Sequence, residues 1–112
     1  MAGMVLEEAA NNTLSENTIN DNMYGIVLAG SSNRIYHNNF INNSEGNAYD
    51  YGTNIWDNGY PSGGNYWDDF DEPDEGAWDN DSDGIVDTPY DIPGEDNQDK
   101  YPLMNHEGRI QA

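Results

Sequence analysis

A repeat with a period of 21 residues runs through the first half of the chain, and it restricts the possible folds more than any other feature. The triplet that begins at Asn12 returns at Asn33 and, less closely, at Asn54, and the triplet that begins at Asn17 returns at Asn38. A period of about 20 residues is typical of solenoids, in which each unit completes its core only by stacking on its neighbours.

The spacing of apolar residues within one repeat indicates which solenoid the chain forms. Four aliphatic residues follow at intervals of five, seven and two, which fits neither a helical face nor a leucine-rich repeat. They are Leu14, Ile19, Ile26 and Leu28. Short strands joined by bends fit better, with asparagine or glycine at the bends in left-handed conformations. Gly25 is expected to return as Gly46. We therefore predict an all-β fold, a parallel β-helix of about two to three turns.

Stacked turns of this length would align equivalent side chains in the core. Leu14 is expected to lie over Ile35, and Ile19 over Phe40. The asparagines that open the repeats would form a ladder of amide hydrogen bonds along the stack. This ladder would consist of Asn12, Asn33 and Asn54.

The repeat fades after Asn58, which divides one folded domain into three segments. Residues 1–10 are expected to be a short lead-in, residues 11–58 the stacked turns, and residues 59–112 an irregular acidic cap. Of the 22 acidic residues, 15 lie at or beyond Asp68, so this segment is too polar for a large core of its own. Its expected buried anchors are Tyr90, Ile92, Tyr101, Leu103 and Met104.

Charge excludes several classes of partner. The net charge is −19, with only three basic residues, which argues against binding to nucleic acid or to an anionic membrane surface.

We see no signal peptide and no stretch that could be inserted in a bilayer. The aromatic content of 12% is unlike that of a disordered acidic tail. The absence of cysteine excludes disulfides and thiolate metal sites.

A calcium loop is the most specific motif of the acidic segment. Asp79, Asp81 and Asp83 alternate with small residues, so their side chains can converge on one ion, while Gly84 permits a sharp turn and Ile85 offers its carbonyl. Only oxygen ligands are available, and these suit Ca²⁺ far better than copper or zinc. We therefore predict Ca²⁺ as the bound cofactor.

Spacing alone leaves the remaining ligands of this predicted site open. Asp87 falls at the ninth position of the loop, where ligation is often through water, and the twelfth position is Tyr90, where an EF-hand has glutamate. The loop is therefore not an EF-hand, and a closing carboxylate must come from another segment. The nearest choices are Asp91, Asp96 and Asp99, with Asp68 or Asp69 as further alternatives.

The chain resembles the C-terminal end of NosD-like parallel β-helix repeat proteins, which are abundant at the cell surface of methanogenic archaea or secreted by them. The resemblance rests on the repeat and on four runs, residues 64–69, 79–87, 88–93 and 97–104. It implies a right-handed β-helix and an extracellular or cell-surface setting. If the protein is secreted, the lack of a signal peptide predicts that the chain is part of a longer precursor. The family label also implies a copper-maturation role, for which this chain offers only a weak Met104–His106 pair.

The function predicted from these features is a calcium-stabilised module for adhesion or matrix assembly, without a catalytic constellation. A carbohydrate-binding or polysaccharide-degrading module is the alternative, by analogy with other β-helix folds. Its stacking platforms would be drawn from Tyr24, Tyr36, Tyr49, Tyr51, Trp56 and Tyr60. A NosD-type copper accessory role is the second alternative. The open N-terminal end of the stack would also permit a homodimer.

Overall fold

The computed structural model describes residues 2–8, 10–80, 82–94 and 96–105, which are all-β apart from one 3-10 turn, η1 (Pro73–Glu75). The all-β prediction is confirmed. Within the described residues the strands form three parallel sheets and one antiparallel hairpin. The strands are β1 (Ala2–Leu6), β2 (Thr13–Ser15), β3 (Thr18–Asn20), β4 (Tyr24–Leu28), β5 (Arg34–Tyr36), β6 (Asn39–Ile41), β7 (Gly46–Asp50), β8 (Tyr66–Trp67), β9 (Tyr90–Ile92) and β10 (Asn97–Asp99).

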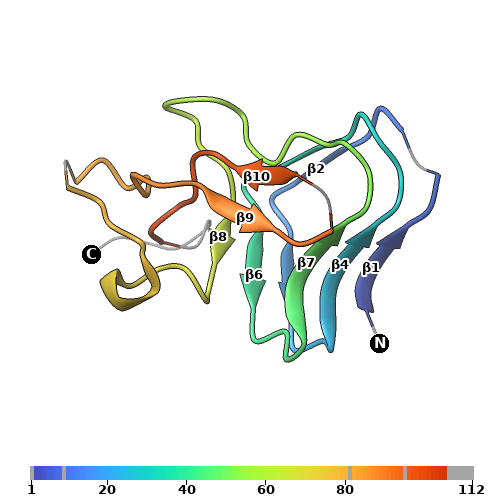
Figure 1. Ribbon diagram of the computed structural model, residues 1–112, viewed down its shortest axis with the longest axis horizontal. Helices are drawn as coiled ribbons and strands as arrows, with labels where there is room; N and C mark the ends of the chain where they lie inside the picture. Colours follow the sequence, from blue (N-terminus) through green and yellow to red (C-terminus); the bar gives the residue numbers. More distant parts are fainter. Residues whose placement is uncertain (1, 9, 81, 95, 106–112) are drawn as a thin grey trace.

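The parallel sheets form because strands one repeat apart lie side by side. Their orders are β1-β4-β7, β2-β5 and β3-β6-β8. Figure 1 shows the strands of the first sheet side by side on the right, with β1 outermost and nearest the N-terminus. Leu14 pairs with Ile35 and Ile19 with Phe40, as predicted from the repeat period. The C-terminal segment, residues 59–105, lies at the other end of this stack (Figure 1).

The sheet β1-β4-β7 repeats at an offset one residue longer than the predicted period, because Tyr24 pairs with Gly46. The predicted return of Gly25 as Gly46 is therefore wrong by one residue. Gly25 instead lies against Asn47, where a Cβ atom would be 2.1 Å from the backbone carbonyl oxygen. A glycine is required there because the two backbones approach too closely for any side chain.

Alanine at Gly25 is expected to lower the free energy of unfolding by about 1–3 kcal/mol, the usual range for overpacking. The reason is the 2.1 Å approach to Asn47, whose backbone is held by pairing. Alanine at Gly3, the equivalent position on β1, would meet the side-chain amide of Asn22 at 2.5 Å, and this amide can move aside. Denaturant unfolding of both variants tests the difference, and equal losses of stability would contradict it.

Strand β1 lies within the segment predicted only as a lead-in. Met4 pairs with Ile26 and Leu6 with Leu28, and the residue offset between these partners is the same as the offset between the partners on β4 and β7. The period found in the sequence does not reveal this strand, because its partners lie at the longer offset of the largest sheet. The first ten residues thus contribute an outer strand to that sheet.

The bends between short strands share one local structure. A residue with φ between 54° and 66° stands directly before an asparagine at each bend. These left-handed residues are Asn11, Glu16, Asp21, Ser32, His37 and Asn42. Most are neither asparagine nor glycine, contrary to the expectation for the bends. At Asn12 and Asn17, for example, the side-chain amide donates to the carbonyl of the residue two positions earlier, at 3.1 Å in both cases, and so spans the bend.

The predicted asparagine ladder is present, and it extends further than expected. Asn33 Oδ1 accepts the backbone N–H of Asn12 at 3.0 Å, and Asn54 Oδ1 accepts that of Asn33 at 2.9 Å. The ladder then continues into the C-terminal segment, where Asn97 Oδ1 accepts the N–H of Asn54 at 3.1 Å. We call these four residues the first ladder.

A second ladder runs parallel to the first and also ends in the C-terminal segment. Asn38 Oδ1 accepts the N–H of Asn17 at 3.0 Å, and Asn65 Oδ1 accepts that of Asn38 at 3.1 Å. Asn65 in turn donates its N–H to Asp99 Oδ2 at 2.7 Å. A carboxylate therefore takes the place of the last amide in this second ladder.

The repeat resumes at β8 after the bend around Gly59–Gly64. Phe40 of β6 pairs with Trp67 of β8, so the chain inserts a short extra loop before this strand reaches its place in the stack. The rings of Phe40 and Trp67 stack with centroids 4.4 Å apart, and Tyr90 of β9 stacks on Trp67 at 4.3 Å. This aromatic column joins the stack to the β9-β10 hairpin.

The buried core follows the inward-facing positions of the stack. Ile26, Leu28, Ile35, Phe40 and Trp56 are fully buried. Among the predicted anchors of the C-terminal segment, Ile92 and Leu103 are buried, whereas Tyr90, Tyr101 and Met104 are half-buried.

Candidate functional site

The predicted calcium loop is organised around Asp79. Its Oδ1 accepts the backbone N–H of Asp83 at 3.2 Å, and its Oδ2 accepts that of Gly84 at 2.9 Å. Gly84 has a φ of 87°, the left-handed conformation expected for the sharp turn. Asp81, the second predicted ligand, lies outside the described residues.

Two further predicted ligands, Asp83 and Asp87, both line a pocket of about 210 Å³. Asp83 Oδ1 accepts the N–H of Ile85 at 2.9 Å, and its Oδ2 accepts the hydroxyl of Tyr60 at 2.8 Å. Asp87 Oδ2 accepts the N–H of Asn80 at 2.9 Å. Both carboxylates thus accept hydrogen bonds from backbone groups of the loop, and both residues line the same surface pocket.

Ile85, which was expected to offer its carbonyl, anchors the end of the loop. Its side chain is buried, and it forms an antiparallel bridge with Leu103. The neighbouring Val86 donates its N–H to Pro102 at 2.7 Å, and Met104 donates to Gly84 at 2.9 Å. The loop is therefore tied to the last described segment of the chain.

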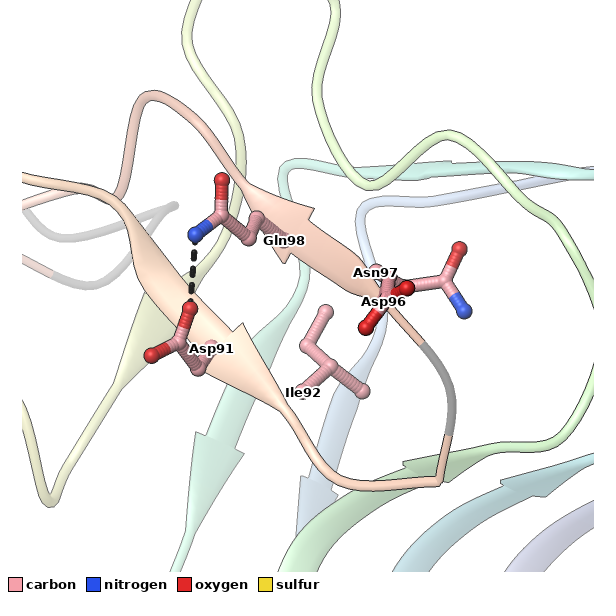
Figure 2. Close-up of a pocket in the computed structure, with 5 residues that line it drawn as sticks. All are labelled: Asp91, Ile92, Asp96, Asn97 and Gln98. Atoms are coloured by element: carbon pink, nitrogen blue, oxygen red, sulfur yellow. Dashed lines mark hydrogen bonds between the residues drawn. The ribbon is translucent and has the colours of Figure 1, made fainter.

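Asp91 and Asp96 lie on the β9-β10 hairpin, away from the loop. Both line a pocket of about 480 Å³. Figure 2 shows Asp91 joined to Gln98 near one end of the hairpin and Asp96 at the other end. The bond from Gln98 Nε2 to Asp91 Oδ1 is 2.7 Å long. This pocket therefore holds two predicted ligands that do not converge.

Asp99 is fully buried at the end of the second ladder. Its Oδ2 accepts N–H groups from Asn65 at 2.7 Å and from the Trp67 ring at 2.9 Å, and its Oδ1 accepts that of Tyr101 at 3.0 Å. Burial raises the pKa of Asp99 to about 7, although these N–H donors act in the opposite direction. A Cβ atom on Gly64 would lie 1.9 Å from this carboxylate, so the glycine makes room for it.

The predicted ligands therefore occupy three places rather than one. Asp79, Asp83 and Asp87 belong to the loop, Asp91 and Asp96 to the hairpin, and Asp99 to the buried ladder. Among the described ranges, no three or more Asp, Glu, His or Cys side chains are grouped as a metal site.

Two acidic residues considered as distant ligands contact the stack instead. Asp68 accepts the N–H of Asn42 at 2.6 Å and the side-chain amide of Asn47 at 3.0 Å. Asp69 accepts the hydroxyl of Tyr90 at 3.0 Å. Burial, followed by the charge of Asp69, raises the pKa of Tyr90 above its usual value. Asp69 also accepts the side-chain amide of Asn47 at 3.1 Å and so links the hairpin to the stacked strands, whereas Asp68 contacts the stacked strands alone.

Sequence reasoning missed the buried carboxylate of Asp50. It accepts hydrogen bonds from the Trp56 ring at 2.8 Å, the Asn54 amide at 2.8 Å and the Gly52 N–H at 2.9 Å. Asp50 pairs with Leu28, so it occupies a core position of the repeat. An alignment at the longer offset of this sheet would have revealed an acid in place of an aliphatic residue.

The donors that copper prefers are scarce in the described part of the chain. The Nε2 of His37 lies 2.8 Å from the carbonyl oxygen of Ser62 and 3.1 Å from its hydroxyl. The ring of His37 also packs edge-on against Tyr36. His106 lies outside the described residues, and the chain has no cysteine. His37 is thus engaged by Ser62 and Tyr36, and in the described part of the chain it belongs to no group of three or more His, Cys, Asp or Glu side chains that could hold a metal.

The aromatic residues considered as sugar platforms have different environments. Trp56 is fully buried, and Tyr60 is bonded to the acidic loop through Asp83. In contrast, Tyr24, Tyr49 and Tyr51 gather at one groove. These three tyrosines therefore share one groove, whereas Tyr36 packs edge-on against His37.

Comparison with known proteins identifies one family. A family model described as "Periplasmic copper-binding protein (NosD)" matches residues 1–72, which include every strand through β8. No curated protein and no solved structure matches the chain significantly. The described residues contain no helix with the length and apolarity needed to cross a membrane.

Proposed function

Because this chain belongs to the NosD family, we propose that it is a structural module of an extracytoplasmic protein, used in adhesion or matrix assembly. In this proposal the stacked strands form a right-handed parallel β-helix, which the C-terminal segment caps. Right-handedness is expected because connections between parallel strands of one sheet are right-handed in about 98% of cases. Calcium stabilises the acidic cap.

The observation that carries the capping role is the end of each ladder. Asn97 completes the first ladder and Asp99 the second, so residues of the C-terminal segment occupy the positions of a further turn. Tyr90 extends the aromatic column in the same direction. An end covered in this way cannot pair with another strand, which prevents edge-to-edge association.

The support for calcium is the chemistry of the acidic loop. Asp79, Asp81 and Asp83 alternate in sequence, and Asp83 shares a pocket with Asp87. Carboxylates this dense repel one another, and a hard divalent cation with oxygen ligands relieves that repulsion. Binding would also stabilise the anchored loop, because an ion that binds the folded state more tightly than the unfolded chain shifts the equilibrium toward folding.

Calcium is expected to raise the free energy of unfolding by about 2.7 kcal/mol when its free concentration is 100 times the dissociation constant. Thermal and denaturant unfolding in calcium and in EGTA measures the effect. The Asp81→Asn variant should lose most of this increment, because it removes one ligand charge.

The matched control is Asp74→Asn, which makes the same change of charge at an exposed site outside the loop. It should retain the full calcium increment. Identical unfolding in calcium and EGTA, or an equal loss of the increment in both variants, would overturn the calcium proposal.

The first turn offers an interface for a second copy of the chain. β1 is the outer strand of its sheet at the end opposite the hairpin. Outer strands present backbone groups that pair readily with another chain. We expect a homodimer whose fraction rises with protein concentration in light scattering. A constant monomer mass across the accessible concentrations would contradict this prediction.

A further inference from the structure

A groove lined by tyrosines lies on the outer face of the sheet β1-β4-β7. Its volume is about 290 Å³, and its lining residues are Tyr24, Val27, Tyr49 and Tyr51. Val27 of β4 pairs with Tyr49 of β7, so the two side chains are neighbours across the sheet. Tyr51 follows β7 directly. The groove is therefore built largely on paired strands, which position side chains more accurately than loops do.

Contacts within the groove hold its rings in defined orientations. The rings of Tyr24 and Tyr49 meet edge to face, with centroids 5.4 Å apart and planes at 74°. The hydroxyl of Tyr49 donates to the backbone carbonyl of Glu45 at 3.2 Å. A Cβ atom on Gly46 would lie 3.0 Å from the Tyr49 ring, so glycine gives this ring its space. The groove is thus preorganised before any ligand arrives.

The core of the stack does not require these tyrosines. The inward-facing side chains of the same strands, Ile26, Leu28 and Ala48, are already buried against the apolar interior. Tyr51 is 58% exposed, which leaves a large aromatic surface in water. Grouped exposed aromatic residues mark binding surfaces more often than single ones do.

The charge of the groove restricts its ligand. Its four lining side chains are all uncharged, and the chain as a whole carries −19. Polyanions such as uronate polymers would be repelled, and no cationic side chain in the lining would attract them. The groove therefore suits an uncharged ligand with flat apolar faces and many hydroxyl groups.

We propose that this groove binds a neutral oligosaccharide. The apolar faces of sugar rings would pack on Tyr24 and Tyr51, while tyrosine hydroxyls would exchange hydrogen bonds with sugar hydroxyls. This activity goes beyond the structural role of the module and does not depend on calcium in the acidic loop. Binding to a neutral glycan would allow the module to attach to a polysaccharide layer.

The test uses calorimetric titration of the full chain with neutral hexasaccharides of glucose, mannose, xylose and N-acetylglucosamine. At least one should bind. Tyr51→Ala should weaken that binding about tenfold or more, which corresponds to about 1.4 kcal/mol or more, because it removes an aromatic face on which a sugar ring would pack. Trp78→Ala is the matched control, because Trp78 is 51% exposed and lies outside the groove. Its affinity should stay within about twofold of the parent chain.

Several outcomes would overturn the proposal. These are the absence of binding by all four neutral hexasaccharides, an equal loss in both variants, or preferential binding of an oligogalacturonate. Preferential binding of tetramethylammonium would also overturn it, because an aromatic groove can instead hold an organic cation. Aromatic NMR signals report whether each variant keeps the folded groove. The calcium effect on unfolding is measured separately, so failure here is distinguishable from failure of the structural proposal.

Discussion

Replacing Trp67 by alanine is expected to lower the free energy of unfolding by about 3–5 kcal/mol, the range for large aromatic residues in a core. Trp67 is fully buried between Phe40 and Tyr90, with ring centroids 4.4 and 4.3 Å away. Its ring N–H also donates to Asp99 at 2.9 Å. The variant would lose the aromatic column and leave this buried carboxylate with one donor fewer. Since single domains are stable by about 5–15 kcal/mol, much of the total would be lost.

Trp78→Ala is the control for this prediction. Trp78 is 51% exposed, so its removal creates no cavity in the core. Its effect should stay within about 0.5 kcal/mol, as for most surface substitutions. Denaturant unfolding followed by circular dichroism measures both variants. Comparable losses of stability would contradict the role assigned to the aromatic column.

Replacing Asn65 by alanine is expected to cost about 3 kcal/mol or more, because it leaves several buried polar groups without partners. Asn65 Oδ1 accepts both the backbone N–H and the side-chain amide of Asn38, each at 3.1 Å. Its own amide donates to the carbonyls of Ile35 at 3.0 Å and Trp56 at 2.9 Å. No other side chain of similar size supplies the same donors and acceptors.

Asn12→Ala is the control, since Asn12 stands at the exposed end of the first ladder. Water can replace its hydrogen bonds, so its loss should be about 1 kcal/mol or less. Denaturant unfolding compares the two variants, and amide hydrogen exchange shows whether Asn65→Ala loosens the end of the stack. Equal stability losses would show that the ladder acts only locally.

The repeat was visible in the sequence because stacking imposes the same requirement on each turn. Leu14 over Ile35 and Ile19 over Phe40 follow from one offset, and the first asparagine ladder follows from the same offset. The second ladder could have been found in the same way, because Asn17 and Asn38 are separated by that offset too. The sequence did not reveal that this ladder continues at Asn65. The extra loop before β8 makes the separation between Asn38 and Asn65 longer than the repeat period.

The acidic positions were harder to assign because the residue type alone does not reveal the partner. Asp79 and Gly84 behave as the loop motif suggests, whereas Asp99 is enclosed by donors from Asn65 and Trp67. Both Asp79 and Asp99 are aspartates in the same acidic segment. Their different environments depend on contacts between residues far apart in the chain, which local spacing cannot predict.

The sequence by itself determined the all-β class, the period and the order of aligned side chains in the shorter sheets. These properties are repeated along the chain, so each turn provides independent evidence for the same pattern. Only the tertiary structure decided the longer register of the largest sheet, the return of the chain at β8 and the partners of each buried carboxylate. The physical reason is that each of these depends on a single long-range contact, and a contact made once leaves no repeated signal in the sequence.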